Sequence, residues 1–415
     1  MPKGRALLTA TSTEIPRGKR LRVLVFTSLF PNSVNPLAGT FVLERLRSVL
    51  KFVDVSVIAP VPYFPTWIPV NGRWRNWARV PRIEDVDGFH THHPRYLVLP
   101  KVGMSTHGLS MFAGTLRQVC KRLGEADYDL IDAHYVYPDG YAAALLTSVI
   151  KKPLVVSARG SDINLFSQFR VIRPLIRQVL QRANGLIAVS QALKDMMIGL
   201  GCRSDNLAVI RNGVDPEKFF PQPRLPMLQK LGLPTDRPIV IAVGSLDENK
   251  GFHIVIEAVA RLQSLGVMLL IIGEGPRRSH LLNQIRQSGI QDNVRLIGTV
   301  PHAELSSWYC AADVLCLASL REGCPNVVLE ALACGRPVLA TKVGGIPELV
   351  VSSTFGALVV NRTAEAFEKA LRDTLHTQWD HDAIAAHGRS HGWDNVGMQV
   401  MNVYSRAITQ FHGRA

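Results

Sequence analysis

Ser319–Val350 reads SLREGCPNVVLEALACGRPVLATKVGGIPELV, and this segment decides the fold. An apolar run at Val314–Leu317 predicts a buried strand that leads into it. A loop with glycine and proline follows, and then a helix is expected over Asn326–Cys334, where Gly335 ends it. A strand, a loop, a helix and a further strand in this order indicate an α/β sheet, with the loop at the edge where such sheets bind ligands.

The start of this expected helix is suited to a diphosphate. Its first N–H groups have no partner within the helix, and the helix dipole favours negative charge there. Glu322 lies in the loop and Glu330 about one turn into the helix, and both carboxylates can accept hydrogen bonds from sugar and ribose hydroxyls. Either glutamate alone would more simply be a solvated surface residue.

The rest of the chain predicts two doubly wound domains. Short apolar runs alternate with amphipathic stretches, which is typical of parallel strands covered by helices on both faces. Asn206–Leu233, which contains Asn212, Gly213 and four prolines, interrupts this pattern and marks the join. The expected strands are Leu21–Phe26, Val53–Ala59, Leu130–Ala133, Leu154–Ser157, Leu186–Val189, Ile239–Val243, Met268–Ile272, Val294–Ile297, Val314–Leu317 and Val338–Ala340.

Length and composition agree with this architecture. The 415 residues suit two domains of about 200 residues each. No apolar run is long enough to span a bilayer, and the first twenty residues lack the hydrophobic centre of a secretory signal, so a cytoplasmic location is expected. The six cysteines form no C-x-x-C pair and no zinc spacing, which favours reduced, structural thiols.

The net charge of +14 is unevenly distributed. Residues 1–205 hold 27 Lys and Arg against 14 Asp and Glu, whereas the remainder holds 20 against 19. Nucleic acid, anionic lipid or a phosphate-bearing acceptor could each bind a basic N-terminal half, and a generally basic surface would look the same.

The Ser319–Val350 segment resembles the signature of the retaining glycosyltransferases of family 4, which have the GT-B fold. Further segments of the chain match in order, and together they resemble a subgroup that makes cell-surface polysaccharide, such as teichuronic acid. The resemblance implies transfer of a sugar from a nucleotide sugar, UDP- or GDP-linked, to a polysaccharide or lipid-linked glycan. The matching residues are Glu322, Glu330, Ala331, Gly335, Pro337, Val338, Gly344, Gly345 and Glu348, and the further segments are Ile210–Asp215, Val243–Phe252, Ile271–Pro276 and Leu296–Leu305.

The resemblance also implies domain roles. Residues 20–205 would bind the acceptor and residues 206–391 the nucleotide sugar, in two Rossmann-like domains that face a central cleft. The final segment, about 392–415, would cross back and pack on the N-terminal domain.

In the C-terminal half, the resemblance assigns roles to three side chains. Glu330 would bind the ribose hydroxyls, Glu322 the hydroxyls of the transferred sugar, and Lys250 would neutralise the leaving diphosphate. A surface lysine in a turn is the simpler alternative for Lys250. The backbone N–H groups expected to hold the diphosphate are those of Gly323, Asn326 and Val327.

One position departs from the family pattern. Ser245, expected beside the donor, stands where the family commonly has an arginine, so a bidentate contact with phosphate is missing. Lys250 and the helix N–H groups could suffice, or Arg211, Arg295 or Arg321 could help. A homologue that binds donor with little turnover is a further alternative.

In the N-terminal half, the family places a catalytic histidine where His134 ends a strand. Arg159 stands where many relatives have histidine, and it is expected to face the cleft and meet a phosphate. Asp162 is either structural or in contact with the acceptor. Gly39 and Thr40 begin a helix near the donor phosphate and the acceptor, although a plain helix start would explain Thr40 equally well.

Two segments bear on partners. Val61–Arg82 mixes arginines with aromatic residues, among them Trp67 and Trp74, which we expect to contact the acceptor. Such a mixture suits a membrane interface, a lipid-linked acceptor, single-stranded nucleic acid, or a loop packed on its own domain. Phe166–Arg182 is expected to be a basic amphipathic helix, either at the inner face of an anionic membrane or within the domain. Nucleic acid leaves the Ser319–Val350 match unexplained, so it is not the expected partner.

No metal and no cofactor are expected. The pairs Asp85/Asp87 and Asp127/Asp129 precede or open strands instead of closing them beside a donor site. The resemblance implies a metal-independent reaction in which Lys250 and helix N–H groups replace magnesium. UDP-sugar 2-epimerases share the fold and are the alternative enzyme class.

Overall fold

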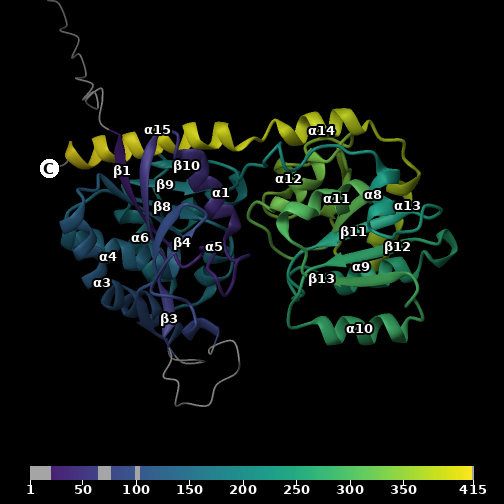
Figure 1. Ribbon diagram of the computed structural model, residues 1–415, viewed down its shortest axis with the longest axis horizontal. Coiled ribbons are helices and arrows are strands. Elements are labelled where there is room, and N and C mark those ends of the chain that lie inside the picture. The colour runs from purple at the N-terminus through teal and green to yellow at the C-terminus, as the bar shows by residue number, and fades with distance from the viewer. Residues whose placement is uncertain (1–19, 64–75, 99–102, 414–415) are drawn as a thin grey trace, which may run out of the picture.

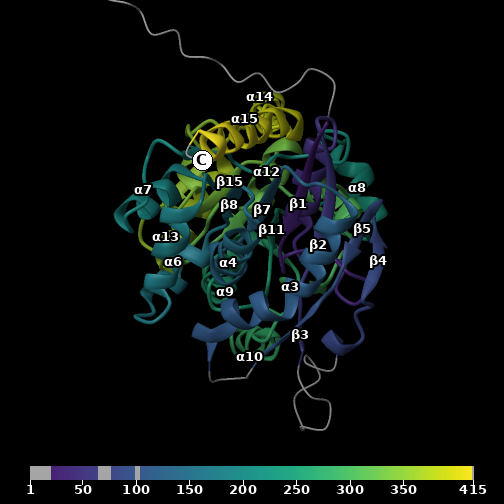
Figure 2. The ribbon, with the colours of Figure 1, turned by 90° about the vertical axis from the view of Figure 1, so that its left-hand side faces the viewer.

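The computed structural model describes residues 20–63, 76–98 and 103–413, so Trp67 and Trp74 lie outside the described residues. Figure 1 shows two α/β domains side by side, one in purple and blue and the other in green. Helices α14 (His381–Arg389) and α15 (Trp393–His412) lie along the same edge of the molecule in both views (Figures 1 and 2). The doubly wound α/β class expected from the sequence is confirmed.

The first sheet is built on buried parallel strands. Its order is β10-β9-β8-β7-β1-β2-β5-β4, and only β4 runs antiparallel to its neighbour. Val, Ile, Leu and Ala make up most of the central strands because helices cover both faces, although β7 also buries Asp132 and His134. The strands are β1 (Leu21–Phe26), β2 (Val53–Ile58), β4 (Ile83–Val86), β5 (Phe89–His92), β7 (Leu130–His134), β8 (Leu154–Ala158), β9 (Gly185–Ala188) and β10 (Leu207–Val209), and a separate pair joins β3 (Val61–Tyr63) to β6 (Arg95–Leu97).

The second sheet is parallel throughout, in the order β13-β12-β11-β14-β15-β16. Its central strands are buried along their whole length. The strands are β11 (Ile239–Val243), β12 (Met268–Ile272), β13 (Val294–Gly298), β14 (Val314–Leu317), β15 (Val338–Thr341) and β16 (Gly356–Val359).

The strand order creates one crevice in each sheet. In the first sheet, β1 is flanked by β2 and β7, and in the second, β11 is flanked by β12 and β14. Connections on the two sides of such a strand diverge to opposite faces, and the opening beyond the strand ends is where open α/β sheets bind ligands. The loops that follow β1, β7, β11 and β14 are therefore the expected places for functional residues.

All ten expected strands are present, with ends that differ by at most one residue. The helix expected over Phe166–Arg182 begins only at Arg173, because Pro174 favours the first turn of a helix and not its interior. No helix of the described residues is both long and apolar enough to cross a bilayer. The helices are α1 (Thr40–Val49), α3 (His107–Glu125), α4 (Tyr141–Ile150), α5 (Ser161–Asn164), α6 (Arg173–Arg182), α7 (Gln191–Gly199), α8 (Arg224–Lys230), α9 (Phe252–Ala260), α10 (Arg278–Gln287), α11 (Leu305–Ala311), α12 (Asn326–Ala333), α13 (Ala364–His376), α14 and α15.

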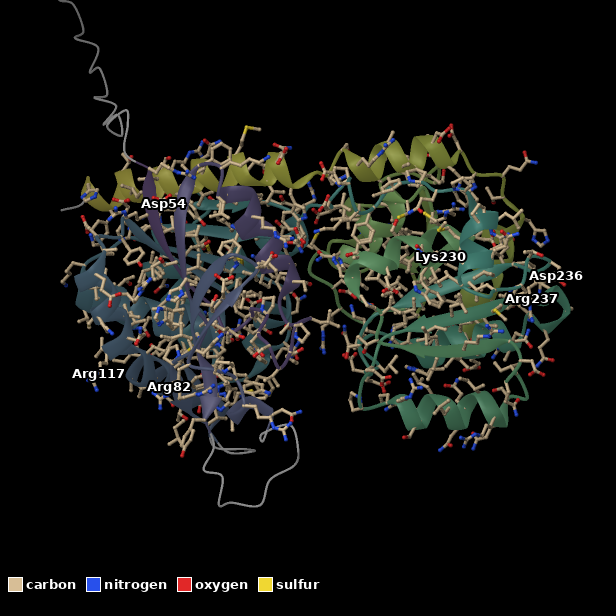
Figure 3. The ribbon with its side chains drawn as sticks, in the orientation of Figure 1. Asp54, Arg82, Arg117, Lys230, Asp236 and Arg237 are labelled. Carbon is tan, nitrogen blue, oxygen red and sulfur yellow. The ribbon has the colours of Figure 1, made fainter. Side chains whose placement is uncertain are left out.

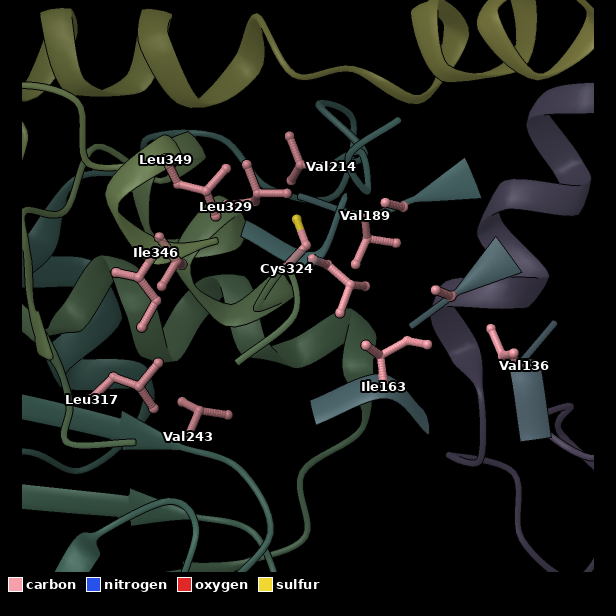
Figure 4. Close-up of a cluster of buried hydrophobic side chains, with 14 of the residues drawn as sticks. Val136, Ile163, Val189, Val214, Val243, Leu317, Cys324, Leu329, Ile346 and Leu349 are labelled. Carbon is pink, nitrogen blue, oxygen red and sulfur yellow. The ribbon is translucent and has the colours of Figure 1, made fainter. Parts of the chain in front are cut away.

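Two chain segments connect the domains, and they run side by side. The N–H of Val214 donates to the carbonyl of His391 at 2.9 Å, and Trp393 lies against Gly213. After this crossing, α15 packs against α1 of the first domain. Figure 4 shows that apolar side chains meet across the boundary, with Ile163 and Val189 near Cys324. This contact holds the carboxyl edges of the two sheets facing one another.

Candidate functional site

The two sheets meet through the loops at their carboxyl edges. The loop after β8 carries Arg159 and Gly160, and the loop after β14 carries Glu322 and Gly323. A Cβ added at Gly323 would lie 2.3 Å from the carbonyl oxygen of Arg159, so only glycine permits this approach. The structure therefore brings these sequence-predicted residues together at one place between the domains.

Lys250 and Glu322 form an ion pair at this place. The Lys250 Nζ lies 2.6 Å from Glu322 Oε1, and the Ser319 hydroxyl donates to the same oxygen at 2.6 Å. Glu322 Oε2 accepts no hydrogen bond from the described residues. A cavity of about 320 Å³ opens beside the pair. Its lining includes Arg159, Ser161 and Asn164 from the N-terminal domain, and Asn249, Arg321 and Glu322 from the C-terminal domain.

Helix α12 begins three residues after Gly323, which lines this cavity. Pro325 precedes it and has no N–H, and the N–H of Val328 donates to the Pro325 carbonyl at 3.1 Å. The N–H groups of Asn326 and Val327 donate to no backbone carbonyl of the described residues. These two groups and the helix dipole can receive an anion.

Glu330 lies one turn into α12 and is 6% exposed. Tyr309 donates to its Oε2 at 2.8 Å, and His302 Nε2 lies 3.0 Å from its Oε1. Although burial lowers the pKa of His302, its hydrogen bond with Glu330 raises that pKa above the ordinary value overall. Each carboxylate oxygen can accept a further bond, so Glu330 can still bind hydroxyls of a ligand.

Sequence reasoning missed His302 and Tyr309. The one available signal was that His302 lies within the Leu296–Leu305 segment and Tyr309 four residues after it, and this segment begins inside β13. A histidine or tyrosine in that position has no distinctive spacing, and only the fold brings it against Glu330.

The catalytic role expected for His134 stays a prediction, and the structure shows where its side chain lies. The residue ends β7 and is completely buried. Its Nε2 lies 3.2 Å from Asp132 Oδ2, and its Nδ1 contacts the Arg159 guanidinium. Nδ1 is thus engaged by Arg159, whereas Nε2 has no hydrogen-bond partner among the described residues, and the strand end places the ring beneath Arg159.

Arg159 reaches the cleft instead. Its NH1 donates to Asn212 Oδ1 at 3.1 Å, and its guanidinium lies 5.2 Å from the centre of the Phe41 ring. Asn212 in turn donates to Asn326 Oδ1 at 2.8 Å. The expectation that Arg159 faces the cleft agrees with this placement beside α12.

Asp162 is completely buried and has a structural position. Its carboxylate accepts the N–H of Val136 at 2.8 Å and that of Gly160 at 2.8 Å. Of the two alternatives left open for Asp162, this geometry fits the structural one, because the carboxylate orders its own loop.

Gly39 precedes α1 in a left-handed conformation with φ 62°. A Cβ there would lie 2.2 Å from the Leu29 carbonyl oxygen, so this turn requires glycine. Thr40 begins α1 and lines a small cavity of about 20 Å³ that also includes Asn326 and Glu330. Thr40 therefore lies beside the small cavity next to Glu330, and its contact with an acceptor stays a prediction.

Ser245 is exposed and lines none of the cavities described above. Of the three cations considered as substitutes for the missing arginine, Arg321 lines the larger cavity. Arg211 is paired with Glu348 at 2.6 Å, and Arg295 is an exposed residue of β13.

Two family models match the chain. Residues 99–218 match the model described as Glycosyltransferase Family 4, and residues 224–391 match that described as Glycosyl transferases group 1. A glycosyltransferase named for teichuronic acid biosynthesis, TuaC of Bacillus subtilis, is 28% identical over 88% of this chain and 90% of its own length. A D-inositol 3-phosphate glycosyltransferase of Streptomyces coelicolor is 30% identical over 69% of this chain and 71% of its own length.

Solved structures share the fold. Sucrose-phosphate synthase of Thermosynechococcus elongatus superposes with a TM-score of 0.72 at 18% identity, over 96% of this chain and all of that one. Anabaena HepE in complex with UDP-glucose gives 0.69 at 20% identity, over 92% of this chain and 99% of that one. The chain therefore belongs to the group 1, family 4 glycosyltransferases and has the GT-B fold.

Proposed function

We propose that this glycosyltransferase moves a sugar from a UDP- or GDP-linked donor to a polysaccharide or lipid-linked glycan, with retention at the anomeric carbon. The observation that carries the proposal is the Lys250–Glu322 pair at the head of α12, with Glu330 one turn further on. Free N–H groups and a cation match a diphosphate. A carboxylate on each side of the N–H groups matches the two hydroxyl-bearing groups that flank it. The names of TuaC and HepE's ligand support the donor and acceptor classes.

The donor would lie along α12. The N–H groups of Asn326 and Val327 would hold the diphosphate, and Glu330 would accept hydrogen bonds from the ribose hydroxyls. Glu322 Oε2, which is not engaged by the described residues, would accept a hydroxyl of the sugar. The acceptor would enter the cavity of about 320 Å³ that Glu322 lines together with residues of the N-terminal domain.

The reaction would break the bond between the anomeric carbon and the diphosphate oxygen. The acceptor oxygen forms the new bond on the same face, and its proton passes to the departing diphosphate. Negative charge grows on the leaving group, so Lys250 and the two N–H groups stabilise the transition state more than the bound donor. Closure of the two domains would exclude water and favour transfer over hydrolysis.

A metal ion is not part of the proposal. Among the described residues, no group of three or more His, Cys, Asp or Glu side chains is arranged to hold one. The charge of the diphosphate would be met by Lys250 and the helix N–H groups, which supply what Mg²⁺ supplies elsewhere. Activity measured with EDTA should therefore equal activity measured with added Mg²⁺.

Peripheral contact with an anionic membrane is also proposed. Phe169 and Val171 are 43% and 66% exposed just before α6, and Arg170 and Arg173 lie beside them. Exposed apolar side chains next to arginines suit the headgroup region of a membrane. Such a contact would bring the cleft close to a lipid-linked acceptor.

The experiment is a turnover screen of UDP-, GDP- and ADP-sugars, followed by NMR of the product. Release of one nucleoside diphosphate and an unchanged anomeric configuration would support the proposal. Inversion would contradict the retaining path. Conversion of the donor into its C2 epimer, visible in the same spectra, would favour the epimerase alternative.

A further inference from the structure

A chain of buried polar contacts runs from the C-terminal helix to the cleft. The Tyr404 hydroxyl, on α15, donates to Asp132 Oδ2 at 2.5 Å. The same oxygen lies 3.2 Å from His134 Nε2, and His134 Nδ1 contacts the Arg159 guanidinium. Tyr404, Asp132 and His134 are all completely buried. The proposed reaction leaves Tyr404 and Asp132 unused.

The burial and charges around these contacts determine the protonation state of His134. Burial lowers the pKa of His134 to about 4, with Asp132 opposing and Arg159 and Arg45 adding to the effect, so the ring is neutral near pH 7. Burial raises the pKa of Asp132, but His134, Arg45 and Tyr404 outweigh it and the carboxyl stays ionised. A guanidinium only donates, so Nδ1 offers its lone pair to Arg159 and the neutral ring carries its hydrogen on Nε2, which lies 3.2 Å from Asp132 Oδ2.

This series of polar contacts ends at Arg159, a cation that is not paired with an anion in the described part of the protein. Arg159 forms no ion pair with a carboxylate in the described part of the chain, and its Nε has no hydrogen-bond partner there. Burial and the neighbouring Arg45 lower the pKa of Arg159 to about 9, yet it remains charged at pH 7. A partly desolvated guanidinium in this state is stabilised by any anion that reaches it.

The position of the guanidinium identifies that anion. Arg159 bonds to Asn212, and Asn212 donates both to the Asn326 side chain at 2.8 Å and to the Cys324 carbonyl at 3.3 Å. The guanidinium is therefore held beside the first turn of α12, where the proposed function puts the donor diphosphate.

We propose that His134 is a positioning residue, and that Tyr404, Asp132 and His134 hold the Arg159 guanidinium where it binds the donor diphosphate. The inference rests on the proposed function, because it needs a diphosphate at the head of α12. It differs from the role that the family resemblance implies, because His134 does not contact the sugar and α15 becomes part of the donor site. Arg159 thereby supplies a charge that Ser245 lacks.

The test compares nucleoside diphosphates with their monophosphates. Calorimetry with UDP and UMP, GDP and GMP, and ADP and AMP gives the ratio of the two affinities, which reports on the terminal phosphate. We expect Arg159→Gln to lower this ratio about tenfold, because a charge-assisted bond to phosphate is lost. Arg159→Lys keeps the charge but loses the two-nitrogen geometry of the guanidinium, so its ratio should lie between those of the wild type and Arg159→Gln. Arg117→Gln, on an exposed residue at the far side of the domain from α15 (Figure 3), should leave the ratio unchanged.

Two substitutions of His134 separate positioning from folding. In His134→Asn, the amide oxygen can take the place of Nδ1 and still accept from Arg159, whereas His134→Gln reaches only towards Asp132. We expect His134→Asn to keep the ratio within about threefold and His134→Gln to lower it further. Tyr404→Phe, which removes one hydroxyl from α15, should lower it about two- to fivefold.

The outcomes are distinct. A wild-type protein that binds no nucleoside diphosphate would overturn the proposed function, and this inference with it. Binding that occurs with an unchanged ratio in Arg159→Gln and Arg159→Lys would overturn this inference alone. Equal losses in His134→Asn and His134→Gln would show that His134 does not act through Arg159.

Discussion

At the scale of single residues, the Lys250–Glu322 pair is the centre of the proposed chemistry. The two side chains are 20% and 9% exposed, so their attraction is only weakly screened by water. The pair also prepares the site, because each residue holds the other at the entrance of the cavity before a donor arrives.

Lys250→Met tests this role. We expect kcat to fall on the order of a hundredfold or more, because charge on the leaving diphosphate loses its cation, with a smaller effect on donor affinity. Ser319 still donates to Glu322, so the loop should keep its conformation. Lys342→Met, on an exposed lysine after β15, is the matched control, and equal kcat values for the two variants would refute the role.

His134 gives a second residue-scale prediction, on the pH dependence of stability. Its pKa is about 4 when folded and 6.5 in the ordinary state, so the unfolded chain takes up the proton first as the pH falls. Its contribution is complete above about pH 6.5 and is lost by about pH 4, a change of roughly 3 kcal/mol. Urea unfolding at pH 7.0 and 5.0 should show a smaller loss for His134→Asn than for the wild type; an identical loss would contradict the assignment.

At the scale of elements, the sequence predicted the buried strands well and the short ones poorly. Central parallel strands are continuous apolar runs, and β11 and β12 were readable for that reason. In contrast, β4 reads IEDV and sits at the sheet edge, where its residues alternate between exposed and half-buried. Nothing in such a short polar segment distinguishes it from a loop.

In the candidate site, too, residues in local sequence patterns could be predicted, whereas contacts between distant segments could not. Glu322 and Glu330 could be singled out because they lie in the loop and the helix that follow a strand, whereas the role of Lys250 was implied by the family resemblance. The contacts of His134 with Asp132, and of Glu330 with Tyr309, join residues whose relative orientation only the folded chain sets.

Gly323→Ala tests the contact between the two loops. A Cβ at this position would meet the Arg159 carbonyl at 2.3 Å and force the loops of the two domains apart. We expect activity to fall by at least about tenfold, since a displacement near 1 Å at a catalytic site has costs of this size. Gly124→Ala, a helical position with nothing within 4 Å, should keep full activity and gain about 0.5–1 kcal/mol of stability. Full activity in Gly323→Ala would show that the loop contact is not needed.

At the scale of the whole molecule, the cleft depends on how the two domains are held. Glu348, from the C-terminal domain, accepts the N–H of Ala192 at the start of α7 at 3.1 Å and pairs with Arg211 in the connecting segment. The apolar contact of Figure 4 includes Val189 and Leu349, which are close in sequence to Ala192 and Glu348. The small cavity next to Glu330 measures only about 20 Å³, so the proposed nucleoside site requires the domains to separate before a nucleoside enters.

The central claim is that a donor nucleotide binds along α12 with its ribose on Glu330. The most direct measurement is thermal unfolding with UDP, GDP and ADP for the wild type, for Glu330→Gln, and for Glu304→Gln, which alters an exposed carboxylate before α11. One nucleotide, at about 100 times its Kd, should stabilise the wild type and Glu304→Gln by about 2.7 kcal/mol, and Glu330→Gln far less. If no nucleotide stabilises the folded wild type, or if Glu330→Gln is stabilised equally, the donor site is not where this account places it.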